Sequence, residues 1–182
     1  MAEPLRLKPA RGGFLRAFGC AWFIREFLLG NGPYDSPKID PAIGAPQADI
    51  FHHYKVALLQ STALDRATRE EERQARREKR AIDPAGIEEL AKAILEHLPY
   101  KSSSCRYHSF VVYFSNLKRL GWVEESGITE PSAYQDRYPD GPPRVFYRLT
   151  AKGRAASMAA WANPRVALYG DGTDKSLSSI RS

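Results

Sequence analysis

The stretch from Ser102 to Arg154 constrains the fold more than any other part of the chain, because helix, turn and strand signals follow one another in it. A serine-rich start leads into apolar residues at helical spacing, and Gly121 ends this run. Two segments with strand character, Trp122–Glu124 and Arg144–Leu149, then flank a proline-rich connection of about 20 residues. The stretch therefore predicts a helix followed by an antiparallel pair of strands.

The helix predicted over residues 103–120 has an aromatic side and a polar side. At 100° per residue, Phe110, Phe114 and Leu117 lie on one side, which we expect to face the core. The other side carries short polar groups and an arginine, which suit base edges and phosphates in the major groove. The predicted DNA-binding residues, including those on the connection between the strands, are Ser102, Ser103, Ser104, Arg106, His108, Ser109, Val112, Ser115, Asn116, Arg119, Arg137, Tyr138 and Arg144.

Particular roles follow from the chemistry of these side chains. Arg119 suits a guanine edge or a phosphate, and Asn116 suits an adenine edge. The hydroxyls of the residues at 102–104 are expected to cap the helix, and a helix N-terminus attracts phosphate. In the connection, Arg137 and Tyr138 are suited to a minor groove or a phosphate strand.

Residues 84–160 resemble the winged helix-turn-helix regulators of the MarR and PadR kind. The resemblance lies in Leu117–Gly121 followed by Trp122-Val123, and in Tyr147–Gly153, which reads Tyr-x-Leu-Thr-x-x-Gly. It implies a DNA-binding fold with a two-stranded wing, commonly used as a dimer whose interface is formed by helices outside the module. The connection between the strands is longer than is usual in these regulators, and residues 1–46 have no counterpart in them.

The remaining sequence divides into segments by composition. We expect a mainly α fold with a small antiparallel β wing, that is, a winged helix-turn-helix with extra N-terminal helices. The expected segments are a tail, apolar helix and loop over 1–46, a long helix over 47–82, the winged-helix domain over 83–163 and a flexible tail over 164–182. Thr150 is the expected N-cap of a last helix, and Asp83 with Pro84 begins the helix before Pro99.

The helix expected over Phe14–Leu29 is apolar nearly all round. Such a helix is buried either against its own chain or against another copy. We expect a homodimer formed through the N-terminal helices. A protein partner docked on the same helix is an alternative.

The formal net charge is +6, and residues 101–182 hold most of it, with 12 Lys and Arg against 7 Asp and Glu. A positive field attracts polyanions but does not identify one. Residues 65–80 mix seven bases with five acids. For that run a solvated helix or linker is favoured over a basic arm on DNA.

Catalysis and metal binding have little support in the sequence. Cys105 and His108 are three residues apart on the predicted helix, but no second pair lies at ligand spacing, so we predict no metal, no cofactor and no enzyme activity. The most apolar segment is too short and too charged to span a bilayer, and no signal peptide is evident. We expect no membrane association and a cytoplasmic, nucleoid-associated protein.

The sequence predicts a sequence-specific double-stranded DNA-binding protein, a transcriptional regulator that reads the major groove with residues 103–120 and uses a long wing at 125–143. Two alternatives stay open. One is a protein-interaction scaffold that docks a partner through the apolar N-terminal helix. The other is a single-stranded nucleic-acid binder that stacks bases on Tyr134, Tyr138 and Phe146.

Overall fold

A computed structural model describes residues 18–103, 105–133, 137 and 141–169. Within these residues the fold is mainly helical with one small antiparallel sheet, as the sequence predicts. The elements in chain order are α1 (Cys20–Leu28), β1 (Ala45–Pro46), α2 (Gln47–Glu78), α3 (Pro84–His97), η1 (Tyr100–Ser103), α4 (Tyr107–Arg119), β2 (Val123–Glu130), β3 (Arg144–Leu149), α5 (Ala151–Ala155), α6 (Met158–Ala162) and α7 (Pro164–Tyr169).

The sheet has three strands in the order β1-β3-β2, all antiparallel to their neighbours. Val123 pairs with Leu149 and Glu130 with Arg144, and the ladder is irregular between Glu125 and Thr129. The second predicted strand is confirmed at its bounds, whereas the first is longer than Trp122–Glu124 and shortens the connection to residues 131–143. β1 was not predicted, because two residues that include a proline have no periodicity to detect.

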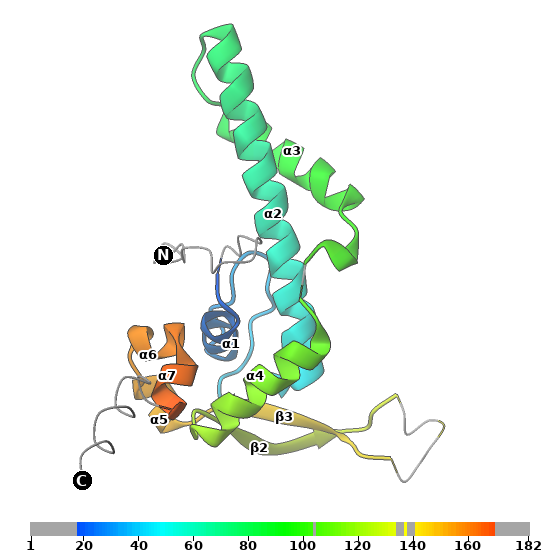
Figure 1. Cartoon of the computed structure of the whole chain (residues 1–182). Coiled ribbons are helices and arrows are strands. Elements are labelled where there is room, and N and C mark those ends of the chain that lie inside the picture. The colour runs from blue at the N-terminus through cyan, green and yellow to red at the C-terminus, as the bar shows by residue number, and fades with distance from the viewer. Residues whose placement is uncertain (1–17, 104, 134–136, 138–140, 170–182) are drawn as a thin grey trace, which may run out of the picture.

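The hydrophobic core joins segments that are far apart in the sequence. Phe23 and Phe27 of α1 pack near Tyr54 of α2, while Phe110 and Phe114 of α4 and Tyr147 of β3 close the other side. In Figure 1 helix α1 lies between α2 and the short C-terminal helices. Helix α1 is therefore part of the central core, and other segments of the same chain cover its apolar side.

The first half of α2 belongs to this core, but its second half stands out from the rest of the molecule together with α3 (Figure 1). We call residues 65–98 the arm. α3 has no fully buried residue, and its main contact is with α2. Its start is the predicted one, since the Asp83 side chain accepts a hydrogen bond from the backbone N–H of Ala85.

α2 ends at Glu78 rather than at Ile82 as predicted. Lys79 takes a left-handed backbone conformation with φ 53° and turns the chain. The Arg80 guanidinium then binds Glu71 on the previous turns, and the Asp83 backbone N–H donates to the same carboxylate at 2.8 Å. This cluster closes the arm at its tip.

The C-terminal part forms three short helices instead of the single one expected. Thr150 caps the first of them as predicted, because its Oγ1 accepts from the Gly153 N–H at 2.9 Å. Gly153 has no room for a side chain, since a Cβ there would lie 2.2 Å from the Trp122 carbonyl oxygen. Residues 164–169, which the sequence predicts to fray, form α7 with Pro164 buried.

Candidate nucleic-acid interface

Helix α4 is amphipathic in the way the sequence predicts. Phe110, Phe114 and Leu117 have at most 1% of their surface exposed and hold the helix on the core. The edge-to-face contact of Phe114 with Tyr147 fixes α4 against the sheet, with ring centroids 5.1 Å apart. Because these contacts fix the rotation of the helix, they also determine which residues face outward.

The outward side of α4 carries the predicted stripe of polar and small residues. His108, Ser109 and Val112 are exposed, and 51% of the Val112 surface is accessible. Ser115 and Asn116 are half-buried. No acidic residue occurs in Tyr107–Arg119, so a polyanion meets no repulsion from the helix itself.

Arg119 is exposed but has an internal partner. Its guanidinium donates to the hydroxyl of Tyr169 on α7 at 3.0 Å and lies 5.7 Å from the centre of the tyrosine ring. α7 therefore lies over the C-terminal end of the stripe and leaves its N-terminal part open. Sequence reasoning missed Tyr169, because the residues after Pro164 have no pattern that would place them on α4.

The residues before α4 do not form the serine cap that the sequence predicts. The helix begins at Tyr107 rather than at 103, and its N-cap is Arg106, which makes no capping bond with its side chain. Ser103 is buried, and its hydroxyl donates to the Tyr100 carbonyl inside the 3-10 turn η1. Ser102 and Arg106 are exposed beside the start of α4, while Ser104 lies outside the described residues.

The turn before α4 is held by an aromatic and cationic cluster on α2. The Nδ1 of His52 lies 3.2 Å from the Tyr100 hydroxyl, and the Lys55 ammonium sits 3.9 Å from the centre of the same ring. Burial, followed by the neighbouring Cys105, raises the pKa of Tyr100 above its ordinary value. These contacts give η1 a structural role, because they fix where α4 begins.

The predicted residues on the sheet and its connection have different surroundings. Arg144 binds Asp49 at 2.5 Å and Glu130 at 2.7 Å, which ties β3 to the start of α2 and to β2. The carboxylate oxygens of Asp49 and Glu130 would both have to be displaced before Arg144 could bind a phosphate. Arg137 is exposed in the connection, and Tyr138 lies outside the described residues.

Further cations lie around α4 besides the predicted ones. Lys118 is exposed with its ammonium 5.2 Å from the centre of the Tyr147 ring, and Arg165 on α7 is exposed. The two acids nearest in sequence, Glu124 and Glu125, lie on β2, and Glu124 is bound by Arg148 at 3.0 Å. The surroundings of α4 are therefore more basic than the predicted residues alone suggest.

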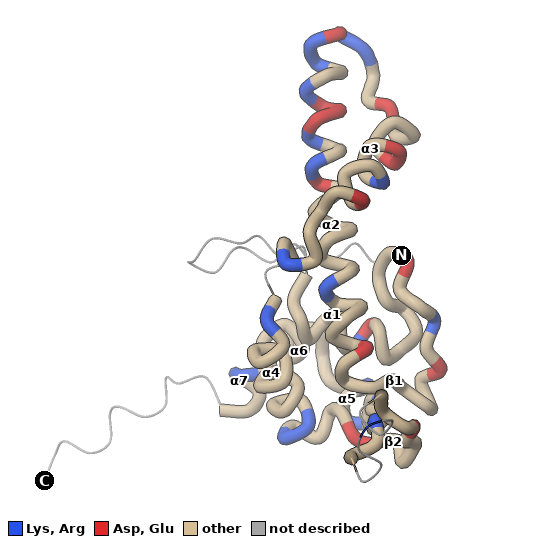
Figure 2. Tube along the Cα trace, turned by 90° about the vertical axis from the view of Figure 1, so that its right-hand side faces the viewer, with Lys and Arg blue, Asp and Glu red and all other residues tan. Residues whose placement is uncertain are grey.

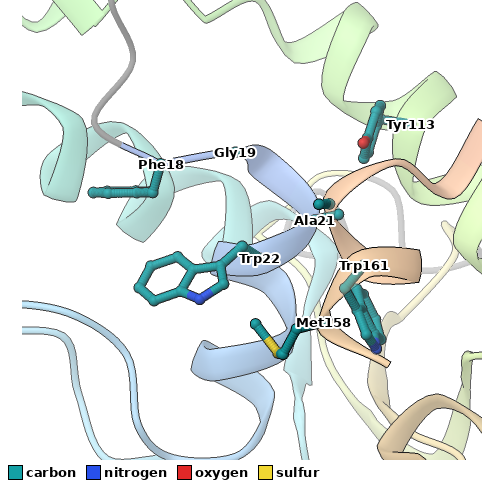
Figure 3. A pocket seen from close by; sticks show the side chains of 8 residues that line it. Phe18, Gly19, Ala21, Trp22, Tyr113, Met158 and Trp161 are labelled. Atoms are coloured by element: carbon teal, nitrogen blue, oxygen red, sulfur yellow. The ribbon is translucent and has the colours of Figure 1, made fainter. Parts of the chain in front are cut away.

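The described part of the chain contains no group of three or more His, Cys, Asp or Glu side chains placed to hold a metal ion. Its apolar pocket between α1, α4 and α6 has a volume of only about 30 Å³, against roughly 300 Å³ or more for a ligand site. Trp22, Tyr113 and Trp161 line this pocket (Figure 3). Its lining packs the three helices together, and burial raises the pKa of Tyr113 to about 12.

None of the described helices is both long enough and apolar enough to cross a lipid bilayer. Comparisons of the chain with protein-family models, with curated proteins and with solved structures found no match.

Proposed function

We propose that this protein binds double-stranded DNA as a winged-helix protein, with α4 as the recognition helix and the β2–β3 hairpin as the wing, and that it acts as a transcriptional regulator. Support comes from the order of the elements. α1, β1 and α2 precede α4, which leads directly into β2 and β3, and β1 completes the small sheet beside β3. The arm, residues 65–98, is inserted between the first half of α2 and α4, so the proposed winged helix is built from residues on both sides of the arm.

The observation that carries the proposal is the exposed, acid-free side of α4. An α-helix with its side chains is about 10 to 12 Å across, and the major groove of B-DNA is about 12 Å wide. In that groove the imidazole of His108 and the hydroxyl of Ser109 meet base edges, and Val112 offers an apolar contact to a thymine methyl group. Arg119 reaches a guanine edge or a phosphate after it leaves Tyr169.

Residues outside α4 supply the backbone contacts in this proposal. The side chains of Ser102 and Arg106 are exposed beside the start of the helix and suit phosphates on one strand. Arg137 in the wing suits the neighbouring minor groove or phosphate strand. Arg144 contributes only indirectly, by holding the wing on α2.

A dimer formed through the N-terminal helix has little support in α1. Phe23, Ile24 and Phe27 of α1 have no exposed surface, so the described part of the predicted helix offers little apolar surface to a second copy, while Phe14 and the residues up to 17 lie outside the described residues. The same burial disfavours α1 as the docking surface for a protein partner. The exposed Val112 on α4 favours a different second candidate, in which a protein partner rather than DNA covers the outer side of this helix.

Selection from a random duplex library, followed by gel-shift titration of the selected duplex, tests the proposal. We expect His108→Ala combined with Arg119→Ala to weaken binding by about tenfold or more, since each base contact contributes roughly 1 to 3 kcal/mol. The matched control is His97→Ala combined with Lys38→Ala, two exposed residues outside α4. Its affinity should stay within about twofold of the wild type.

The same titration separates the candidates. Failure of the selection to enrich any duplex, or equal losses in the two double variants, would contradict the proposal. Single-stranded competitors that displace the duplex at equal concentration would favour the single-stranded alternative. Binding to a protein partner through Val112 would persist at high salt, whereas phosphate contacts weaken steeply as the salt concentration rises.

A further inference from the structure

The arm gathers the arginines of α2 within one arc, although its sequence mixes acids and bases. Three of the five acids in residues 65–80 are occupied within the arm itself. Glu71 is buried and bound by Arg80, and Glu78 accepts from the same arginine at 2.6 Å. Glu70 accepts from Arg73 at 2.7 Å. These carboxylates are therefore already neutralised by neighbours on the arm.

The arginines of the arm gather on the side of α2 that faces away from α3. The buried residues Ala67, Glu71 and Ala75 mark the side that faces α3. At 100° per residue, Arg69, Arg73 and Arg76 lie on the opposite side. Arg66 and Arg77 lie beside them, and the five arginines together span an arc of about 100°. The arginine stripe, as we call it, consists of Arg66, Arg69, Arg73, Arg76 and Arg77, of which Arg66 also lines a groove with Ala93 and His97 of α3.

The stripe is open to solvent. No acid of residues 65–80 falls within its arc, but Asp65 and Glu72 lie at one edge and Glu70 lies at the other. Glu70 is bound by Arg73 and Arg77. Within the described residues no ion pair occupies Arg66, Arg69 or Arg76. Like charges held side by side repel one another, so the gathering of Arg66, Arg69 and Arg76 does not stabilise the isolated arm.

The type of cation also points to a ligand. Residues 65–80 hold six arginines and a single lysine. Arginine binds phosphate through two parallel N–H donors, whereas lysine acts as a point charge. A merely solvated helix has no need for this preference, so the composition of the stripe favours a surface that carries repeated phosphates.

The stripe and α4 lie toward the same side of the molecule. In Figure 2 the Lys and Arg positions of α2 follow the left-hand edge of the arm, and α4 and α7 lie toward the left of the body below it. The exposed acids Glu88, Glu89 and Glu96 belong to α3, whose opposite position turns them away from the stripe. The arm therefore offers a polyanion one attractive side and one repulsive side.

We infer that the arginine stripe is a second nucleic-acid contact, which binds the phosphate backbone of the duplex beyond the segment held by α4; this inference rests on the proposed function. From Arg66 to Arg77 the helix extends about 17 Å, which matches about five base-pair rises of 3.4 Å. The contact gives affinity without sequence preference, because phosphates carry no base information.

Binding of the full-length double variant Arg69→Gln and Arg76→Gln tests this inference. Both side chains are exposed and lie in the middle of the stripe. On a selected duplex of about 30 base pairs, we expect the slope of log K against log salt to fall by about 2, since each lost phosphate contact removes about 0.9. On a duplex of about 10 base pairs, one helical turn centred on the same sequence, the variant should match the wild type.

The control is Lys38→Gln combined with Lys92→Gln, which removes the same charge from exposed positions outside the stripe. It should keep the wild-type slope on the long duplex. An unchanged slope in the arginine variant, or an equal fall in the control, overturns the inference. Binding of the duplex by the wild-type protein would in that case leave the proposed function standing. Absence of wild-type binding to either duplex overturns the proposed function itself.

A protein surface is the other class of partner that such a stripe suits, in particular the acidic side of α3 in a second copy. Light scattering of the free protein distinguishes it. We expect the arginine double variant and the wild type to have the same mass. A wild-type dimer that the variant dissociates would assign the stripe to self-association and overturn the inference.

Discussion

The contact between Arg119 and Tyr169 determines whether the Arg119 guanidinium is available to a ligand on α4. Their hydrogen bond and their ring contact hold the guanidinium on the protein's own α7. DNA that uses Arg119 must first break this contact. In the proposed complex, α7 therefore weakens DNA binding by the free energy that the Arg119–Tyr169 contact contributes.

Tyr169→Ala should tighten duplex binding by about twofold to fivefold, because an exposed cation–π contact contributes roughly 0.5 to 1 kcal/mol. Fluorescence anisotropy with a labelled duplex measures the change. Tyr34→Ala, at another exposed tyrosine that lies on the loop after α1, is the control and should leave the affinity unchanged. Weaker binding by the Tyr169 variant would mean that α7 orients Arg119 for DNA instead of withholding it.

Thr150 is the residue at which the strand pair is joined to the C-terminal helices. Its hydroxyl donates to the Gly121 carbonyl at 2.6 Å while it accepts from Gly153. Thr150→Ala removes both bonds and should lower the free energy of unfolding by about 1 to 2 kcal/mol. Urea denaturation followed by tryptophan fluorescence measures this loss.

The control for Thr150 is Thr68→Ala, whose hydroxyl bonds only a carbonyl of its own helix, that of Leu64. Alanine is a better helix former than threonine, so this control should lose little or no stability. Equal losses at the two positions would contradict the capping role.

Sequence reasoning succeeded at residues whose partners are local. Asp83 and Thr150 cap helices that begin within three residues of them, and local spacing is enough to predict such bonds. Arg144 shows the opposite case. Its partner Asp49 lies on α2, and no local pattern connects the two segments.

Among the elements, the long periodic helices were the easiest to predict and the short ones the hardest. The aromatic side of α4 follows from its spacing, but its start does not, because the serines before it form a separate 3-10 turn. The apolar residues of α1 predict burial either against its own chain or against a second copy. Periodicity shows that a helix is covered, and it does not show by what.

The arm is the element whose stability should depend most on pH. The Arg80 hydrogen bond, followed by the Asp83 backbone N–H, lowers the pKa of Glu71 to about 2. A lowered carboxylate pKa contributes stability that is present above the unfolded value near 4.5 and is lost as the pH falls toward 2. Amide exchange in α3 should therefore accelerate, relative to the helices of the body, as the pH falls from about 5 to 2.

Glu71→Gln keeps the size of the side chain and removes its charge. In this variant α3 should already exchange faster at neutral pH, and the difference from the wild type should disappear near pH 2. Glu72→Gln, at an exposed position one residue along, is the control and should behave as the wild type. Wild-type protection in the Glu71 variant would show that the cluster does not hold the arm.

At the scale of the whole molecule, the protein consists of a body and an arm (Figure 1). The body is built from segments before residue 65 and after residue 98, and all three tryptophans, Trp22, Trp122 and Trp161, lie in it. Arg66 and Leu98 line one groove, so the two ends of the arm lie side by side. The sequence alone did not indicate this insertion, because the two parts of the body meet only in three dimensions.

Replacement of residues 67–96 by a short Gly/Ser loop should therefore leave the body folded. We expect a cooperative urea transition by tryptophan fluorescence, because the core residues are all retained. The shortened protein should still bind the selected duplex, with a smaller salt dependence than the full chain. A broad, non-cooperative transition would show that the body requires the arm.

Photo-crosslinking tests the central claim, the contact between the outer side of α4 and DNA, most directly. Benzoylphenylalanine replaces Val112, the most exposed apolar residue of α4, and in a control protein it replaces Tyr34 on the loop after α1. The account predicts that irradiation with the selected duplex joins DNA to the protein at position 112 and not at position 34. Crosslinks at neither position in a bound complex, or only at position 34, would contradict it.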